Sequence, residues 1–255
     1  MMLGQRADVA SVEAVREELG LNKPIYVQYA KFMVNAFQGD LGRSYSSNRQ
    51  VVQTILQKLP ATALLSFSAL FISSIIGVLI GIISATKQYT FTDNASMLFA
   101  LFGISFPQFA FGLVMAWLFG HILKWFPISG YINEGWQYLI LPMLTLALRP
   151  LAITARITRS SMLDVMSQDY VRTAKAKGLS NYMVIFKHTL RNALNPVITT
   201  ISASLAATLG GVFFIEYIFN WPGIGLLAID AIFKLDFPMI QGTVLFSAII
   251  FVVIN

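Results

Sequence analysis

The sequence contains no cysteine and only two histidines, and charged residues make up 12% of its 255 positions. Without cysteine the chain cannot form a disulfide framework, a thiolate metal site or a cysteine nucleophile. The charged fraction is about half of that in a typical globular protein, whereas hydrophobic residues reach 56%. A soluble fold cannot bury that much apolar surface, so the composition indicates an integral membrane protein.

Two long stretches of the chain lack any ionisable side chain. One lies between Lys58 and Lys87 (28 residues) and the other between Asp93 and His121 (27 residues). Each exceeds the roughly 20 residues that a helix needs to cross the hydrocarbon core of a bilayer. We therefore predict spans over residues 59–86 and 94–120, with a kink in the second at Pro107, which has no backbone N–H.

Three further spans are predicted, which makes the fold class an all-α membrane protein with about five spans. Residues 136–157 form the third and must carry Arg149 inside or near the membrane. Residues 196–215 are uncharged and rich in small side chains that let helices approach closely, and residues 238–255 form the last span. Gly77 and Gly81, four residues apart in the first span, fit a close helix crossing.

The distribution of positive charge predicts the orientation. The segment from Arg149 to Arg191 has two acids and eight bases, namely Arg149, Arg156, Arg159, Arg172, Lys175, Lys177, Lys187 and Arg191. By the positive-inside rule this segment is cytoplasmic. Alternation of the spans then places residues 121–135 and 216–237 outside, and puts His121 and His188 on opposite faces, too far apart to share a metal ion.

The same alternation places residues 1–58 outside the cell. This segment has seven bases and five acids, but no apolar span or signal peptide that would carry it across. We therefore expect a missing first span upstream and a last span cut short at the other end. Within the segment, residues 12–19 read as a short amphipathic helix, residues 24–37 show a second apolar periodicity, and residues 39–48 are turn-like.

The cytoplasmic segment carries the strongest chemical signal. Residues 167–177 have helix-compatible composition, with an acid near the start, bases in the last turn, and Gly178 where a left-handed C-cap falls. A second helix is predicted to begin after Ser180 and to continue into the fourth span. The alternative is a cationic loop held at an anionic membrane surface without further function.

The residue order within this segment is similar to a known motif. Tyr170 to Ser180 reads YVRTAKAKGLS and His188 to Pro196 reads HTLRNALNP. Together they resemble the coupling motif of ABC importer permeases, in the form found in the dipeptide, oligopeptide and nickel permease family. The general motif has a Glu and an Ala where this chain has Arg172 and Thr173, and its proline comes earlier than Pro196; the peptide and nickel branch resembles the version seen here.

Other hallmarks agree in the same order over essentially the whole chain. They are LGLNKP at 19–24, GDLGRS at 39–44, LPAT at 59–62, RSSML at 159–163, EYIF at 216–219 with WPGIG at 221–225, and DFPMIQG at 236–242. The resemblance implies a type I ABC importer transmembrane domain over residues 59–255, preceded by an extracytoplasmic segment over residues 1–58. Of the six spans that this domain type would have, about five are present here.

The resemblance also implies sites and partners. The coupling region, at about residues 160–191, would dock in a groove of a cytoplasmic ATPase through Tyr170, Arg172, Thr173, Ala174, Lys175, Lys177 and Gly178. An outer loop near the gate would include Glu216, Trp221, Pro222, Gly223 and Gly225, although a Trp-anchored interface turn explains this loop equally well. The implied partners are a second similar permease subunit, two ATPase subunits and an extracytoplasmic substrate-binding protein, assembled in a bacterial or archaeal inner membrane.

The sequence lacks the machinery to power transport by itself. It has no G-x-x-x-x-G-K-[ST] phosphate loop, so ATP and Mg²⁺ are expected on the partner ATPase, and this chain is expected to be no enzyme and to bind no cofactor or metal. No Asp or Glu is predicted deep in a span, which disfavours a proton relay. Arg149, beside Pro150, either faces the pathway and attracts a carboxylate or extends to the membrane interface.

The cargo stays open because these hallmarks describe coupling. Di- and oligopeptides are the predicted solutes, and nickel, glutathione or another small solute is the alternative. A membrane scaffold or receptor that transports nothing would have the same spans and the same basic loop.

Overall fold

The computed structural model describes residues 22–254, and within this range the chain is built from helices, with one isolated antiparallel bridge between Arg43 and Gln50. The prediction of an all-α fold is confirmed. In chain order the α-helices are α2 (Ile25–Phe37), α3 (Val51–Thr86), α4 (Phe91–Ser105), α5 (Gln108–Met115), α6 (Ile140–Met166), α7 (Asp169–Ala176), α8 (Asn181–Met183), α9 (Arg191–Gly211), α10 (Phe213–Ile218), α11 (Ile224–Phe233) and α12 (Phe237–Ile254). Two π-helical segments, Ala116–Ile122 and Val184–Leu190, extend α5 and join α8 to α9, and two 3₁₀ turns, Ile132–Glu134 and Trp136–Leu139, precede α6.

Helices α3 and α6 form the centre of the molecule and pack along much of their length, while α4 and α9 pack against α6 and α12 packs against α9. A Cβ atom placed on Gly77 of α3 would lie 2.8 Å from the Cβ of Thr154 and 2.9 Å from the carbonyl oxygen of Leu151. Gly81, one turn further, faces Thr158 in the same way. The close helix crossing predicted from the two glycines is confirmed.

The helices long and apolar enough to cross a membrane agree with most of the predicted spans. Within residues 22–254 they are α3, the stretch from Trp136 to Met166, and α12, with a fourth if α4 and the α5 segment count together. The fourth predicted span corresponds to α9, which has 21 residues but is rich in Ser, Thr and Asn and is not among them.

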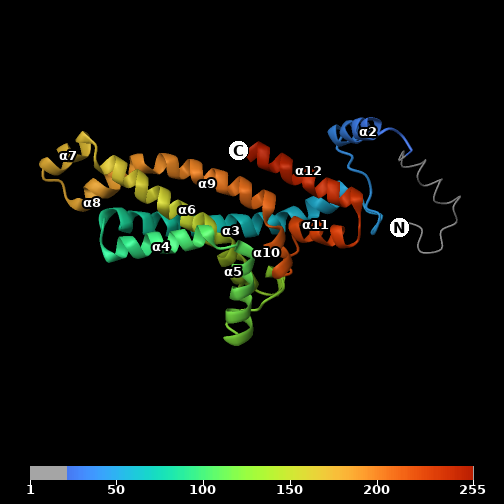
Figure 1. Ribbon diagram of the computed structural model, residues 1–255, viewed down its shortest axis with the longest axis horizontal. Helices are drawn as coiled ribbons and strands as arrows, with labels where there is room; N and C mark the ends of the chain where they lie inside the picture. The colour runs from blue at the N-terminus through green and yellow to red at the C-terminus, as the bar shows by residue number, and fades with distance from the viewer. Residues whose placement is uncertain (1–21, 255) are drawn as a thin grey trace.

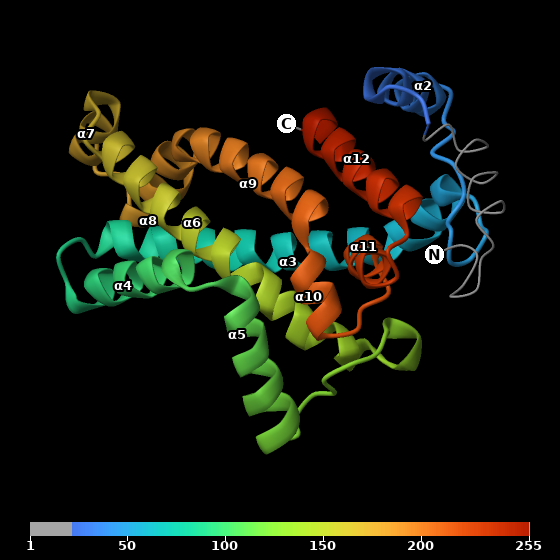
Figure 2. The same cartoon turned by 45° about the vertical axis from the view of Figure 1, so that its right-hand side comes forward.

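The predicted kink at Pro107 is a complete break. Helix α4 ends at Ser105, Phe106 is extended (φ −77°, ψ 130°), and α5 begins at Gln108 after a bend of 104°. A proline disfavours helical geometry in the residue before it, which accounts for the extended Phe106. Helix α5 consequently leaves the layer of long helices at a steep angle (Figure 2).

Two of the regions predicted to lie on opposite sides of the membrane lie toward opposite ends of the molecule's long axis, whereas residues 121–135 begin at the tip of the branch formed by α5 (Figure 1). Helices α7 and α8 lie at one end, and α2 and α11 lie toward the other (Figure 1). The periodicity at residues 24–37 is confirmed as α2, whereas the helix predicted at 12–19 lies outside the described residues. Helix α3 begins at Val51, so it runs through the predicted boundary at residue 58.

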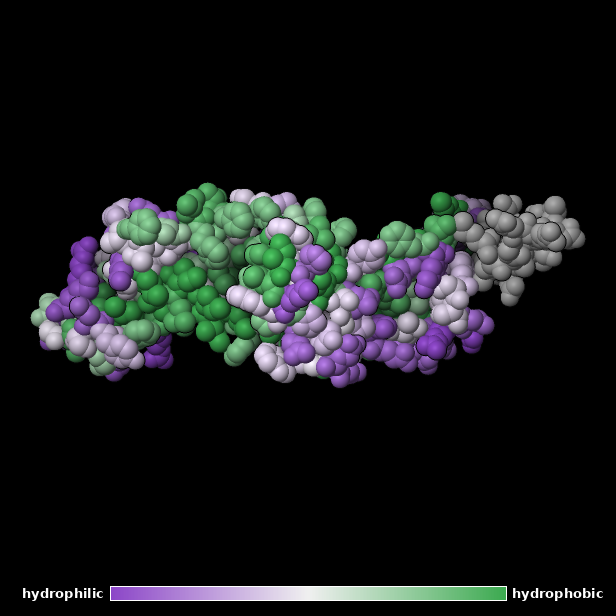
Figure 3. Space-filling model, turned by 90° about the horizontal axis from the view of Figure 1, so that it is seen from below, coloured by the Kyte–Doolittle hydropathy of each residue, from purple (hydrophilic) through white to green (hydrophobic). Residues whose placement is uncertain are grey.

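Much of the outer surface is apolar. Phe71 of α3, Leu98 of α4 and Val253 of α12 are among the large hydrophobic side chains that remain exposed. Hydrophobic surface covers much of the left and centre of one face of the molecule, while hydrophilic surface lies at the left end and from the middle across the lower right half (Figure 3). A water-soluble monomer would not expose so much apolar area, so these faces suit lipid or partner helices.

Candidate functional site

The segment from Ser167 to Leu190, called the coupling elbow below, is a compact unit of two short helices at one end of the molecule (Figure 1). Its small apolar core consists of Val171 and Ala174 of α7, packed on Val184, with Val165 of α6 beside them. Ser180 caps the second helix by accepting a hydrogen bond from the backbone N–H of Met183 at 3.4 Å. The predicted pair of helices is confirmed.

The elbow turns at Gly178, which has φ +77° and follows the last residues of α7. The N–H of Gly178 donates to the carbonyl of Lys175 at 3.0 Å and that of Leu179 to the carbonyl of Ala174 at 3.4 Å, the pattern of a Schellman cap. A Cβ at Gly178 would meet nothing within 4 Å. Glycine therefore relieves backbone strain at this position, and the space beyond it is open.

The exposed side of the elbow is basic. Arg172, Thr173, Lys175 and Lys177 are all exposed, and Arg172 makes a solvent-exposed ion pair with Asp169 at 3.6 Å. Tyr170 is 43% exposed, and its hydroxyl accepts a hydrogen bond from the side-chain amide of Asn192 in α9 at 2.8 Å. These side chains are arranged so that another protein could contact them.

Ala174 has a different position from the one that the resemblance implied. It is 5% exposed and packs inside the elbow, so its small size permits the approach of the two elbow helices. Of the seven predicted coupling residues, this one is covered by the chain's own helices.

A buried charged cluster lies where α3, α4 and α6 meet near the elbow. Asp93, 1% exposed, accepts hydrogen bonds from Arg159 of α6 at 2.6 and 2.7 Å, one to each carboxylate oxygen. The hydroxyl of Ser84 also donates to Asp93, and the backbone N–H of Tyr89 donates at 2.9 Å. Such a bidentate pair fixes orientation as well as distance, so this cluster locks the three helices together.

The predicted outer loop is present as the turn at residues 219–223 between α10 and α11, but it is largely buried, and Glu216 lies in the helix before it. Glu216 lies in helix α10 and is 0% exposed. Its carboxylate accepts hydrogen bonds from the Thr62 hydroxyl at 2.7 Å and from the N–H of Leu226 at 3.0 Å, while the Thr62 oxygen accepts from the N–H of Ile224 at 2.8 Å. Glu216 and Thr62 thus satisfy the first amides of α11, which have no partner within the helix.

Burial changes the pKa of the Glu216 carboxyl, which lies just after the fourth predicted span. Desolvation raises the pKa of Glu216 from 4.5 to about 7, although the hydrogen bonds from Thr62, Leu226 and Gly225 act in the opposite direction. Glu216 thus combines a raised pKa with hydrogen bonds that link α10 to α3 and α11.

Trp221, Gly223 and Gly225 of the same predicted loop pack against α3 and α10. Trp221 is 0% exposed and donates from its indole N–H to the carbonyl of Ala61 at 2.8 Å, and Pro222 is half-buried beside it. A Cβ at Gly223 would overlap the Glu216 carboxylate, and one at Gly225 would come within 2.6 Å of the backbone of Phe213. The motif WPGIG therefore permits close packing around Glu216.

A third cluster joins the N-terminal segment to the start of α12. Asp236, 1% exposed, accepts hydrogen bonds from the hydroxyl and N–H of Ser46 and from the N–H of Tyr45 at 3.0 Å, and the Ser44 hydroxyl donates to it at 2.5 Å. Burial tends to raise the pKa of Asp236, but these hydrogen bonds prevail and lower it. The hallmarks at 39–44 and 236–242 thus meet in space.

The membrane helices also expose polar side chains. Arg149 and Arg156 are exposed on α6, seven residues apart, so they share one face about 10 Å apart along the axis. Asn195, Thr199 and Ser202 are exposed on one face of α9. Arg149 forms no ion pair with any carboxylate of residues 22–254. Within that range no group of three metal-ligating side chains is found.

A multi-helix membrane chain with a basic elbow at one end and buried polar clusters between its helices has the architecture of a transport permease. The chain belongs to the family of binding-protein-dependent transport system inner membrane components, whose profile matches residues 77–255; the profile of that family's N-terminal part matches residues 1–66. This confirms the family resemblance seen in the sequence. The chain is accordingly a permease subunit of an ABC importer, a multi-pass inner-membrane component without enzymatic activity, and ATP hydrolysis lies in a partner.

Relatives and a solved structure agree with this classification. The glutathione transport system permease protein GsiC of Escherichia coli K12 is 41% identical over 255 residues, covering 100% of this chain and 83% of the relative. Its counterpart in Pectobacterium atrosepticum is 42% identical over 252 residues, covering 99% and 82%. A crystal structure of an amino acid ABC transporter with histidines matches with a TM-score of 0.58 at 14% identity, over 79% of this chain and 88% of that one, which supports the fold alone.

Proposed function

We propose that this permease imports glutathione or a similar small peptide that bears carboxylates. In this proposal it pairs with a second, similar permease subunit, two ATPase subunits bind below the pair, and a substrate-binding protein delivers the solute from outside. The relatives named as glutathione transport permeases support the cargo, which is one of the alternatives that the sequence left open. Arg149 on α6, which pairs with no carboxylate among residues 22–254, is consistent with an anionic solute.

The observation that carries the coupling role is the division of α7 into a buried and an exposed side. Val171 and Ala174 hold the helix to its own chain, while Arg172, Lys175 and Lys177 face outward. An ATPase that bound the basic side would move a compact unit. Because the elbow connects α6 to α9, its displacement would change the positions of both helices, and such rigid-body shifts open and close transport pathways.

Gly178 offers a sharp test, and Gly39 provides its matched control. Both glycines follow a helix C-cap, both have positive φ (+77° and +79°), and a Cβ at either position meets nothing within 4 Å. Glutamate at either position therefore introduces the same side chain and the same left-handed strain, about 1 kcal/mol. Only Gly178 lies on the proposed ATPase contact.

The experiment reconstitutes the full-length permease with its partner permease, ATPase and binding protein in vesicles, and measures ATP-driven uptake of labelled glutathione, a dipeptide and Ni²⁺. Wild-type protein should accumulate glutathione or the dipeptide. Gly178→Glu should insert normally but lose uptake, whereas Gly39→Glu should retain it. Uptake of Ni²⁺ alone, or no uptake by an assembled complex, would contradict the proposal, and equal activity of the two variants would remove the elbow from the coupling mechanism.

A second variant addresses the cargo. If Arg149 faces the pathway, Arg149→Met should raise the KM for an anionic peptide by about tenfold or more, because a charge-assisted hydrogen bond contributes roughly 1.5–3 kcal/mol. If the side chain only reaches the membrane interface, the KM should stay the same at equal expression. An unchanged KM removes Arg149 from the proposed pathway.

A further inference from the structure

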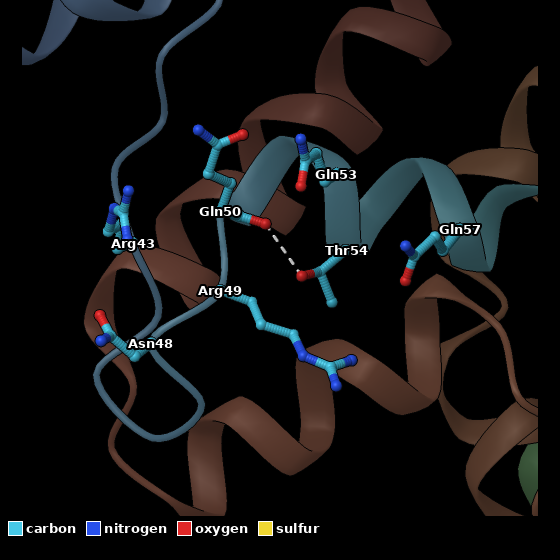
Figure 4. A pocket seen from close by; sticks show the side chains of 7 residues that line it. All are labelled: Arg43, Asn48, Arg49, Gln50, Gln53, Thr54 and Gln57. Atoms are coloured by element: carbon cyan, nitrogen blue, oxygen red, sulfur yellow. Dashed lines mark hydrogen bonds between the residues drawn. The ribbon is translucent and has the colours of Figure 1, made fainter.

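A polar pocket opens between the N-terminal segment and the first turns of α3, outside the clusters described above. Its volume is about 560 Å³, within the roughly 300–1,000 Å³ range of small-ligand sites. The lining residues are Arg43, Asn48, Arg49, Gln50, Gln53, Thr54 and Gln57, and every one of them is polar (Figure 4). This composition suits a hydrated, charged solute and does not suit a lipid chain.

Backbone hydrogen bonds fix the shape of the pocket wall. The N–H of Ser44 donates to the carbonyl of Arg49 at 2.9 Å, the N–H of Asn48 donates to the carbonyl of Ser44 at 2.9 Å, and Arg43 pairs with Gln50 in a β-bridge. The turn is also anchored to the start of α12, because the Ser44 hydroxyl donates a hydrogen bond to Asp236. The backbones that carry the two arginines are therefore held next to each other.

The pocket is electropositive. Neither Arg43 nor Arg49 makes an ion pair with a carboxylate in the part of the chain that the structure describes, and none of the lining residues is acidic. Asp236, beneath the turn, is already occupied by the hydroxyls and amides of residues 44–46. Two guanidinium groups without a carboxylate suit an anion and repel a metal cation.

The floor of the pocket adds amide groups. Gln53 and Gln57, four residues apart, share one face of the first turns of α3, and Gln50 is the extended N-cap residue just before them. Each side-chain amide can donate and accept a hydrogen bond, as a peptide group does. Arg49 extends along this helix below Thr54, and the amides of Gln50 and Gln53 lie above it (Figure 4).

We propose that this pocket is a receiving site on the outer face for a small solute that carries both carboxylate and amide groups, occupied before the solute enters the pathway. The proposal rests on the proposed import function and deepens it by naming the chemistry of recognition. The arginines bind a carboxylate, and the glutamine row pairs with peptide groups. The lining has no His, Cys or carboxylate side chain to coordinate a nickel ion, so this site discriminates against that cargo.

The test uses the full assembled transporter in lipid nanodiscs, with glutathione as the probe. Direct binding is measured without the binding protein, and the KM of uptake is measured with it. Arg43→Gln combined with Arg49→Gln should weaken glutathione binding and raise the KM at least tenfold. The matched control, Lys23→Gln combined with Lys31→Gln, removes two exposed charges from the same segment away from the pocket and should behave as wild type.

Further arms keep the result decisive. Gln53→Leu combined with Gln57→Leu changes exposed side chains only, so it should fold and should also weaken binding. Glutathione with both carboxylates esterified should bind the wild-type protein as weakly as the arginine variant binds glutathione. Unchanged glutathione binding in the arginine variant would overturn the proposed receiving site. The same conclusion follows if the arginine variant binds glutathione normally but loses affinity for the substrate-binding protein. Failure of the wild-type protein to import glutathione counts against the proposed function instead.

Discussion

Replacement of Glu216 tests its buried hydrogen-bonded cluster most sharply, because the hydrogen bonds predict losses of stability of very different size for two variants. Glu216→Ala leaves the Thr62 hydroxyl and the Leu226 N–H without their acceptor in a buried site. At about 1–3 kcal/mol for each orphaned donor, the loss of stability should be about 2–6 kcal/mol. Glu216→Gln can still accept from Leu226 through its oxygen and can donate to the Thr62 oxygen, so its loss at neutral pH should stay below about 1.5 kcal/mol.

The pH dependence supplies a second readout with a defined sign. Because burial raises the pKa of Glu216 from 4.5 to about 7, the folded state holds the proton more tightly than the unfolded state does. This contribution is fully present below pH 4.5 and is lost as the pH rises through 7. It amounts to about 3 kcal/mol, at 1.36 kcal/mol for each unit of pKa difference. Glutamine cannot ionise, so Glu216→Gln should lack this component.

The assay is thermal unfolding of the purified protein in detergent at pH 5 and pH 8, followed by tryptophan fluorescence, to which the buried Trp221 beside Glu216 contributes. The wild-type melting temperature should fall more between pH 5 and pH 8 than that of Glu216→Gln. Equal pH dependence in the two proteins would refute the buried, titrating carboxyl. Equal stability of the Ala and Gln variants would refute its role as an acceptor.

Three further predictions concern the other clusters and the helix crossing. Asp93→Ala should destabilise the fold by about 3–5 kcal/mol, because Arg159 loses its buried partner. The control Asp164→Ala, at an exposed position of α6, should change stability by less than about 0.5 kcal/mol. Equal effects of the two variants in chemical unfolding would contradict the role of the Asp93 cluster. Asp236→Ala should speed proteolysis in the turn at residues 39–48 at neutral pH. Wild-type protein should show the same acceleration on acidification, because the lowered pKa of Asp236 gives stability that is lost as the pH falls through the folded-state pKa. Identical digestion rates of the variant and the wild-type protein at neutral pH would contradict the role of Asp236 in holding the turn. Gly77→Val should lower the stability of the fold by about 1–3 kcal/mol, because the added side chain overpacks against Thr154. The control Leu79→Val, at an exposed position, should be tolerated. The same melting temperature for both variants would contradict the close crossing of α3 and α6.

Local patterns in the sequence predicted the elements that depend on neighbouring residues. Helix α2, the end of α7 just before Gly178 and the start of the next helix after Ser180 follow from periodicity and capping, which act within a few residues. The first span was identified by its lack of charge, and its glycine pair by their spacing. These features need no information about the rest of the chain.

The sites that the sequence missed depend on contacts between distant residues. Glu216 was predicted in an outer loop, and its acceptor role was missed because it involves Thr62, 154 residues away; Asp93 was not singled out because its partner Arg159 is 66 residues away. Ala174 was expected to face a partner, but the packing of the elbow places it inside. At Pro107 the sequence predicted a disturbance, but its size depends on how α5 packs against α6 and α10.

The central claim is that the basic elbow faces the cytosol and is covered by an ATPase subunit. Because the chain has no cysteine, Lys177→Cys introduces a single thiol on the exposed side of the elbow. A membrane-impermeant maleimide should label it in inside-out vesicles and not in right-side-out vesicles, and an assembled ATPase should protect it. Labelling from the outside, or labelling that the ATPase leaves unchanged, would contradict the account.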